Sequence, residues 1–179
     1  MIRLAQNGDA RAFGALVERH RARVEAVAWR LTRDASAAHE LTHDVFVRMH
    51  RSLATFRRDA TLATWLYRMV VNVCHDHERR IVRDRSIPLE MAHALPSPAD
   101  TPDITTEAAE RARVIDRMVQ SLPETMRDAV VLRYAGGLAY DEIAATLGIA
   151  PGTVASRIHR ALRIIGLTLE SQGIREDSL

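Results

Sequence analysis

The stretch LAYDEIAATLGIAPGTVASRIHRAL, residues 138–162, decides the fold class. Ile143 and Leu147 lie on one face of a short helix, and Gly148 supplies the left-handed residue that ends it. Pro151 suits the first turn of the helix that follows. Two short helices joined by a glycine turn predict a helix-turn-helix, whose second helix would enter the major groove of DNA.

The second of these helices separates an apolar face from a basic one. Its expected buried face repeats at a spacing of about four and comprises Val154, Ile158, Leu162 and Ile165. The opposite side, at about 100° per residue, carries Thr153, Ser156, Arg157, His159, Arg160 and Arg163. No acidic residue occurs between Glu142 and Glu170, so nothing in this stretch repels phosphate. We predict that this face binds duplex DNA; a helical hairpin with a solvated arginine face is the alternative.

A third helix, expected over residues 62–82, carries a second polar stripe. The stripe consists of Arg68, Asn72, His75 and Arg79, at spacings of four, three and four. Asparagine is uncommon in the middle of a helix, because its side chain competes for backbone hydrogen bonds. It is also a natural partner for adenine or another exposed base edge. The stripe therefore indicates contact with nucleic acid, although a wet helix face with an incidental asparagine fits the same residues.

Helical periodicity covers most of the remaining chain. Asp9 is a plausible N-cap for a long first helix, and Ser36 is expected to cap the next one after a break at residues 32–36. The periodicity fails between residues 83 and 106, where four prolines interrupt it. Fully extended, this segment could reach roughly 80 Å. We expect an all-α fold in which two small helical domains are joined by a Pro-rich linker, the second domain containing the helix-turn-helix.

The expected boundaries follow from these breaks. The first domain covers residues 1–82, the linker 83–106 and the second domain 107–170, with a polar tail at 171–179. The net charge is +5 over residues 1–82, −4 over 83–110 and +1 over 111–179, which is consistent with separate modules. All 25 basic residues are arginine, a side chain suited to phosphates and guanine edges, although a GC-rich genome would also favour arginine codons.

The cellular setting is indicated by what the chain lacks. Cys74 is the one cysteine, so no disulfide can form within the chain, which fits a reducing compartment. No stretch approaches 18 consecutive apolar residues, and no signal peptide precedes Asp9. We expect a cytoplasmic, nucleoid-associated protein that does not insert into a membrane.

We expect no catalytic or metal-binding site in this chain. His75 and His77 are two residues apart on a helix, which points their side chains about 200° apart. His39 and His43 are four residues apart with Glu40 between them, the H-E-x-x-H order of a metal motif, but we expect no metal site there. We therefore expect no enzyme activity, no cofactor, no metal and no small-molecule substrate.

Two runs of the chain resemble one family, the sigma-70-type initiation factors of the extracytoplasmic-function, two-domain subgroup. HELTHDVFVRMHRSLATFRRDATLATWLYRMVVN resembles part of the family's second conserved region, and LPETMRDAVVLRYAGGLAYDEIAATLGIAPGTVASRIHRAL resembles its fourth. Their order, the linker and the absence of a third region agree with this subgroup. The resemblance implies an RNA polymerase sigma factor whose partners are core RNA polymerase, promoter DNA and an anti-sigma factor.

The resemblance also implies three sets of site residues. Polymerase contacts would fall on Leu41, Asp44, Val45 and Phe46. The melted −10 strand would meet Phe56, Arg57, Thr64, Trp65, Arg68, Asn72, His75 and Arg79. The −35 duplex would be read by Thr153, Ser156, Arg157, His159, Arg160 and Arg163.

The chain departs from the family pattern at Ala139, where Ser or Thr usually caps the first helix of the reading motif. Loss of that cap should cost about 0.5–2 kcal/mol. Two other functions compete with the sigma interpretation. A stand-alone helix-turn-helix regulator would have no use for a strand-binding stripe, and a pure decoy for an anti-sigma partner would not need Arg160 and Arg163 on an acid-free face.

Overall fold

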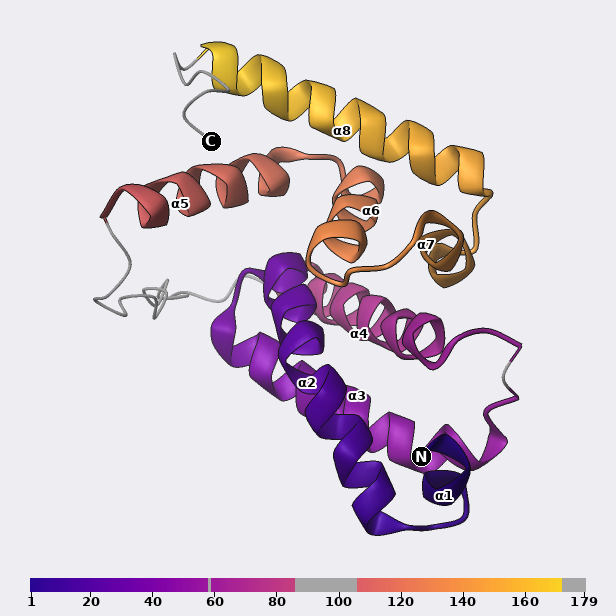
Figure 1. Cartoon of the computed structure of the whole chain (residues 1–179). Helices are drawn as coiled ribbons and strands as arrows, with labels where there is room; N and C mark the ends of the chain where they lie inside the picture. Colours follow the sequence, from indigo (N-terminus) through magenta and orange to yellow (C-terminus); the bar gives the residue numbers. More distant parts are fainter. Residues whose placement is uncertain (58, 86–105, 172–179) are drawn as a thin grey trace.

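A computed structural model of the chain describes residues 1–57, 59–85 and 106–171, and this part contains helices and no strands (Figure 1). The all-α fold class is thereby confirmed. The helices are α1 (Ile2–Gln6), α2 (Ala10–Thr32), α3 (Ala35–Ser52), the 3₁₀ turn η1 (Leu53–Thr55), α4 (Leu62–Arg85), α5 (Thr106–Ser121), α6 (Glu124–Tyr134), α7 (Tyr140–Leu147) and α8 (Pro151–Ser171).

Helices α1–α4 form the N-terminal unit, in which α2, α3 and α4 pack against one another. Asp9 caps α2 as expected, because its carboxylate accepts a hydrogen bond of 3.0 Å from the backbone N–H of Ala12. The expected cap of the next helix was wrong. Asp34 caps α3 through a 3.0 Å bond from Ala37, so Ser36 lies inside the first turn. The break between the two helices is correspondingly short.

Helices α5–α8 form the C-terminal unit, and α7 and α8 are the expected helix-turn-helix. Gly148 ends α7 in the left-handed region, with φ of 67°, and Pro151 begins α8. The expected burial of Leu162 was wrong, since its side chain is 44% exposed while Ala161 is fully buried. A spacing of four drifts by about 40° per step around a helix, so two steps from Val154 rotate Leu162 out of the core.

The described residues refine the boundaries expected from the sequence. Helix α4 continues to Arg85, three residues past the expected end of the third helix. Helix α5 begins at Thr106, where the expected linker ends. The rest of that linker, residues 86–105, and the tail residues 172–179 lie outside the described part of the chain.

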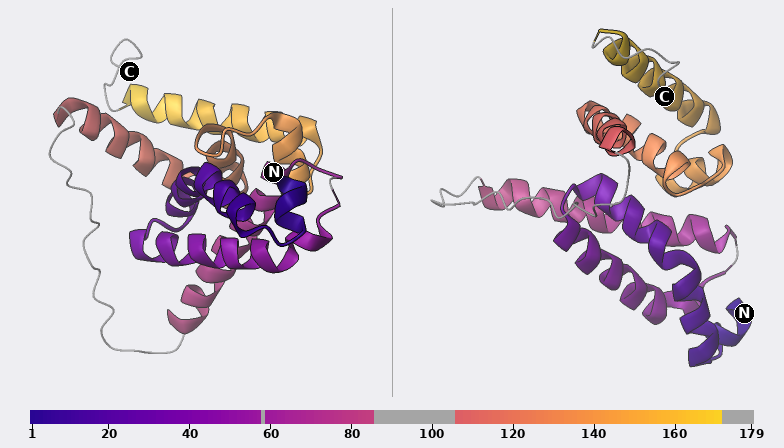
Figure 2. Two further views of the ribbon diagram at one scale, coloured as in Figure 1. Left: turned by 60° about the horizontal axis from the view of Figure 1, so that its bottom comes forward. Right: turned by 60° about the vertical axis from the view of Figure 1, so that its left-hand side comes forward.

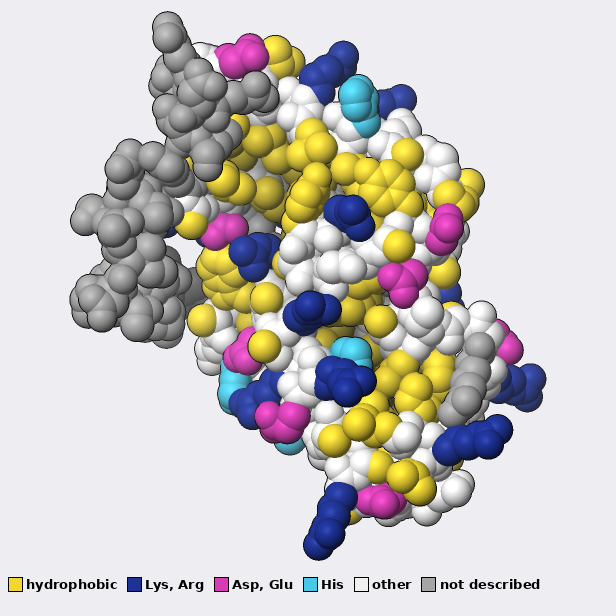
Figure 3. Space-filling model, viewed as in Figure 1, with side chains coloured by type: hydrophobic (Ala, Val, Ile, Leu, Met, Phe, Trp, Pro, Cys, Tyr) yellow, Lys and Arg dark blue, Asp and Glu magenta, His cyan; other side chains and the backbone are white. Residues whose placement is uncertain are grey.

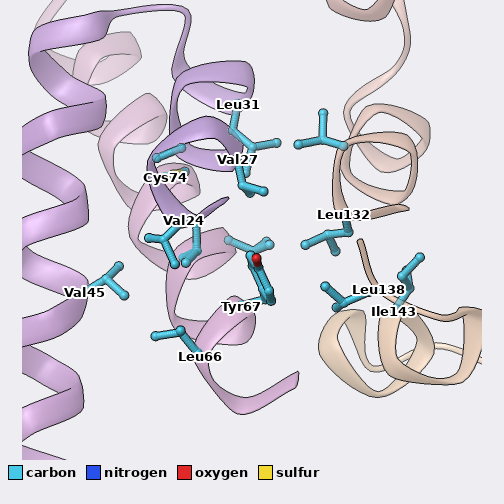
Figure 4. Packing of buried hydrophobic residues seen from close by; sticks show 14 of the residues in the cluster. Val24, Val27, Leu31, Val45, Leu66, Tyr67, Cys74, Leu132, Leu138 and Ile143 are labelled. Atoms are coloured by element: carbon cyan, nitrogen blue, oxygen red, sulfur yellow. The ribbon is translucent and has the colours of Figure 1, made fainter. Parts of the chain in front are cut away.

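One apolar core runs through both units. Figure 2 shows the C-terminal helices lying over α2 and α4, and the buried residues of both units form a single cluster. Leu132 of α6 and Leu138 of the following turn point across the seam toward Tyr67 (Figure 4). Val27 and Leu31 of α2 line the same seam and are almost completely buried. The two units therefore share one hydrophobic core, which holds them in a closed arrangement.

None of the described helices combines the length and the apolar character that crossing a membrane requires. Cys74 lies in the core and is 1% exposed. Burial, together with the nearby carboxylates of Glu78 and Asp128, raises the pKa of its thiol to about 12. This cysteine is thus a packed apolar side chain in the folded protein.

Replacing Gly136 with alanine is expected to lower the free energy of unfolding by about 1–3 kcal/mol. The new Cβ would lie 2.6 Å from the carbonyl oxygen of Leu132, too close for the turn between α6 and α7 to survive unchanged. The matched control is Gly14→Ala within α2, where nothing lies within 4 Å of the added Cβ. Alanine there should raise stability by about 0.5–1 kcal/mol. Urea unfolding followed by circular dichroism measures both variants, and equal effects would contradict this account.

Candidate nucleic-acid interface and the seam between the two units

The basic face of α8 is open to solvent. Val154, Ile158 and Ala161 anchor the helix in the core, each at most 1% exposed. On the other side Thr153, His159, Arg160 and Arg163 are exposed, and Ser156 and Arg157 are half-buried. Within the described part of the chain, no carboxylate lies within ion-pair distance of the arginines at 157, 160 and 163. All six predicted residues therefore lie on one helix, with the guanidinium groups free for an anionic partner.

The start of α7 compensates in part for the missing cap. Ala139 offers no side-chain acceptor, but the Glu142 carboxylate accepts a 3.0 Å hydrogen bond from the Ala139 backbone N–H. This is the returning half of a capping box. The other carboxylate oxygen of Glu142 accepts a 2.9 Å bond from the Thr61 hydroxyl, in the loop before α4. One glutamate thus supports α7 and ties it to the N-terminal unit.

The polar stripe of α4 lies beside the C-terminal unit. Helices α4 and α7 are packed together, and the Arg68 guanidinium donates a hydrogen bond to the backbone carbonyl of Ala145 in α7. Arg79 bonds Asp76 at 2.8 Å and stays exposed, as does Asn72. In this closed arrangement, Arg68 is therefore bound to protein, whereas Asn72 and Arg79 remain accessible to a nucleic-acid strand.

The loop that leads into α4 is held from both sides. The Gln6 side-chain amide donates to the carbonyl oxygens of Leu53 and Phe56, at 3.1 and 3.0 Å. Phe56 packs against Trp65 with ring centroids 4.9 Å apart. Phe56 and Thr64 are buried, whereas Trp65 is half-buried and Arg57 is exposed. Two of these four residues are thus accessible in this arrangement, Trp65 and Arg57.

The residues of α3 that are predicted to contact the polymerase also include both buried and exposed side chains. Leu41, Val45 and Phe46 belong to the hydrophobic core and are at most 9% exposed. Asp44 is exposed on the outer side of the same helix. The three apolar side chains fix the helix against α2 and α4, so the group available to a partner at these four positions is the Asp44 carboxylate.

Polar contacts border the apolar seam at both ends. Asp116 of α5 lies 3.8 Å from Arg30 and 3.5 Å from Arg33 of the N-terminal unit. The Gln120 side chain donates to the carbonyl oxygen of Arg30 at 2.6 Å. At the other end, the Thr146 hydroxyl lies 3.4 Å from the Thr64 carbonyl oxygen. Ion pairs at a partly solvated surface contribute little, so these contacts set the orientation of the units while the apolar core supplies most of the stabilisation.

His75 of α4 faces two carboxylates of α6. Its Nε2 lies 3.2 Å from an oxygen of buried Asp128 and 3.6 Å from an oxygen of Glu124. The hydrogen bond to Asp128 and the surrounding carboxylates raise the pKa of His75, against the opposing effect of burial. Sequence reasoning missed both partners, because they lie 49 and 53 residues further along the chain and no local spacing connects them.

Apolar side chains gather between α5 and α8 on the face that Figure 3 displays. The groove there is lined by Ile115, Val119, Leu162, Ile165 and Leu169, among others. Leu162 therefore lines a groove between helices, rather than the core position that its spacing suggested.

Comparison with known proteins matches each of the two units to a protein family. The model of Sigma-70 region 2 matches residues 16–84, and that of Sigma-70 region 4 matches residues 112–165. The chain is 33% identical to the RNA polymerase sigma-H factor of Pseudomonas aeruginosa, over 95% of this chain and 92% of that protein. It is 30% identical to the ECF RNA polymerase sigma-E factor of Escherichia coli K12, over 92% and 90%.

Solved structures agree with this assignment. CnrH in complex with the cytosolic domain of CnrY matches with a TM-score of 0.73 and 25% identity, covering 95% of both chains. The sigma factor RpoE of Bartonella quintana, solved with the anti-sigma factor NepR, has the same fold, with a TM-score of 0.69, 21% identity and coverage of 90% and 98%. The chain therefore belongs to the sigma-70 family, as an RNA polymerase sigma factor of the extracytoplasmic-function (ECF) group. Such a factor binds core RNA polymerase and promoter DNA to start transcription.

Exchanging Asp116 for arginine is expected to open the closed arrangement. Three guanidinium groups would then meet where Asp116 now lies close to Arg30 and Arg33. Small-angle X-ray scattering should show a larger radius of gyration for Asp116→Arg than for the wild type. The control is Asp59→Arg, which makes the same charge change at an exposed loop position. Identical radii for Asp116→Arg and the wild type would contradict a role for this contact.

Proposed function

We propose that this sigma factor divides promoter recognition between its two units. The basic face of α8 reads the −35 element as intact duplex, through Ser156, Arg157, His159, Arg160 and Arg163 with Thr153 at its start. The observation that carries this assignment is the exposed, acid-free face described above, on the second helix of a helix-turn-helix. Arginine pairs with guanine edges through two parallel hydrogen bonds, so Arg160 is the best candidate for direct base readout.

The N-terminal unit binds the −10 element as a melted strand. The proposed contacts come from the loop before α4 and from the stripe on that helix, namely Phe56, Arg57, Thr64, Trp65, Arg68, Asn72, His75 and Arg79. A partly exposed indole next to cationic and amide side chains suits an unpaired base, which stacks on an aromatic ring and offers its edge to hydrogen bonds. Because this surface favours the open strand, its binding shifts the duplex toward melting.

The −35 and −10 elements cannot be bound at the same time while the two units stay closed. The names of the −35 and −10 elements imply a separation of about 25 base pairs, or roughly 85 Å at about 3.4 Å per base pair. In the closed arrangement Arg68 is bonded to α7, in the same unit as the duplex-reading helix. We propose that the units separate on the polymerase, with residues 83–106 as the linker between a first domain at 1–82 and a second at 107–170.

The proposed partners are core polymerase and an anti-sigma factor. Polymerase would meet the outer surface of α3 at Asp44, with Leu41, Val45 and Phe46 holding that helix in place. A separate anti-sigma protein is suggested by the complexes in which related folds have been solved, since one contains the cytosolic domain of CnrY and another contains the anti-sigma factor NepR. The factor would act on the nucleoid, in the cytoplasm, with no enzyme activity of its own.

A stand-alone helix-turn-helix regulator is the competing function. Such a protein needs the C-terminal unit and has no need of a polymerase. The match of residues 16–84 to Sigma-70 region 2 disfavours it, because a stand-alone regulator does not need a sigma region of this kind.

Transcription by purified core RNA polymerase on a library of random promoter-length duplexes tests the proposal. With this protein added, transcripts should start downstream of one enriched pair of elements. Arg160→Ala is expected to weaken use of that −35 element about tenfold and to relax base preference within it. Arg11→Ala, an exposed charge on α2, is the matched control. Duplex binding without any polymerase-dependent transcript would favour the stand-alone regulator instead.

Asn72→Ala is expected to act on the other element alone. It should reduce binding of the polymerase complex to a single-stranded −10 oligonucleotide several-fold, because an amide partner for a base edge is lost. Binding of the isolated protein to a −35 duplex should not change. Fluorescence anisotropy with both oligonucleotides separates these outcomes, and an equal loss on both would argue against a divided reading surface.

A further inference from the structure

Three ligand-bearing side chains meet where α4 crosses α6. They are His75 of the N-terminal unit and Glu124 and Asp128 of the C-terminal unit, and one ligand atom from each lies within 4.8 Å of the others. We propose that these residues bind a divalent transition-metal ion, of the Zn²⁺ class, across the seam between the two units. Metal binding goes beyond promoter recognition, although His75 also belongs to the stripe proposed to bind the −10 strand.

The spacing of the ligand atoms suits such an ion. His75 Nε2 lies 3.2 Å from Asp128 Oδ2 and 3.6 Å from Glu124 Oε1. Bonds of about 2.0–2.2 Å to nitrogen and oxygen place the ligand atoms of a tetrahedral ion about 3.3–3.6 Å apart. Glu124 and Asp128 are four residues apart on α6, so both project from the same face of that helix toward His75.

The charge around these residues also favours a cation. Asp128 is almost completely buried, and the half-buried carboxyl of Glu78 lies one turn further along α4. Burial raises the pKa of Glu78, Arg127 and His75 oppose this shift, and Glu124 and Asp128 add smaller effects that raise it. The neighbouring cation Arg127 hydrogen-bonds the Gln120 side chain at 3.3 Å, so its guanidinium is shared with α5. A divalent ion would offset the mutual repulsion of the Glu124 and Asp128 carboxylates.

The ligand types narrow the choice of metal. Imidazole nitrogen suits Zn²⁺, Co²⁺ and similar ions, whereas Ca²⁺ and Mg²⁺ prefer oxygen alone and Cu⁺ prefers sulfur. One histidine with two carboxylates is therefore best matched by Zn²⁺. Co²⁺ can replace it as a coloured probe of the same geometry.

The position of the site gives it a consequence, which rests on the proposed function. Because the ligands come from both units, a bound ion stabilises the closed arrangement by its own binding free energy. His75 belongs to the stripe proposed to bind the melted strand, so metal and strand would compete for it. Zn²⁺ would then reduce binding of the −10 strand while leaving the duplex-reading face of α8 accessible.

Isothermal titration of the purified full chain with Zn²⁺ tests the site without DNA or polymerase. The wild type should bind one ion per chain, and the Co²⁺ form should show the visible absorption of a nitrogen-containing site. Glu124→Gln and His75→Gln should each weaken binding at least about tenfold. Glu124 is 57% exposed, so its replacement leaves the core intact. The matched control is His39→Gln, which removes a surface histidine that lies 3.3 Å from Glu25.

Absence of saturable Zn²⁺ binding by the wild type would overturn the proposal, as would unchanged affinity in both the Glu124→Gln and His75→Gln variants. Scattering adds a second readout, since Zn²⁺ should reduce the radius of gyration of Asp116→Arg but not that of Asp116→Arg combined with Glu124→Gln. If the chain binds Zn²⁺ as described but supports no promoter-dependent transcript, the metal site stands and the proposed function fails.

Discussion

Burial of Leu132 and Leu138 against Tyr67, Val27 and Leu31 is the interaction on which the rest of the arrangement depends. Each unit has an apolar face that its own helices leave uncovered, and the seam joins the two faces into one core. Hydrophobic burial is not directional, so the apolar seam alone would permit several orientations. The polar contacts at its ends, from Asp116 and Glu142, select the one observed.

The same seam brings two of the groups proposed to bind the −10 strand into protein contacts. Arg68 bonds the backbone of α7, and His75 faces Asp128 and Glu124. Under the proposed function, each of these contacts must be given up before the melted strand can be held. Closing of the units and binding of the strand are then mutually exclusive, so any partner that stabilises one state opposes the other. An anti-sigma protein, a metal ion and the polymerase would all act on this one equilibrium.

The helix-turn-helix and its basic face could be predicted from the sequence, because both depend on local rules of helix geometry. Gly148 and Pro151 fix the turn of the helix-turn-helix, and the acid-free arginine face of α8 follows from helical rotation alone. The same reasoning was wrong for Leu162, since a constant spacing of four accumulates rotation that the true period of 3.6 does not. The seam and the partners of His75 could not be predicted, because they depend on how two units pack. No spacing within a single helix encodes a contact between residues 75 and 128.

The closed arrangement of the free protein, and its opening on the polymerase, is the central claim of this account. Energy transfer between dyes on the two units measures it most directly, with the labels on Glu18→Cys in α2 and Leu167→Cys in α8, both exposed positions. Cys74 is buried and should not react with the dyes. Transfer should be high for the free protein and fall markedly when core polymerase and promoter DNA are added together. Equal transfer in both states would contradict the account, because one fixed arrangement cannot place both units on elements roughly 85 Å apart.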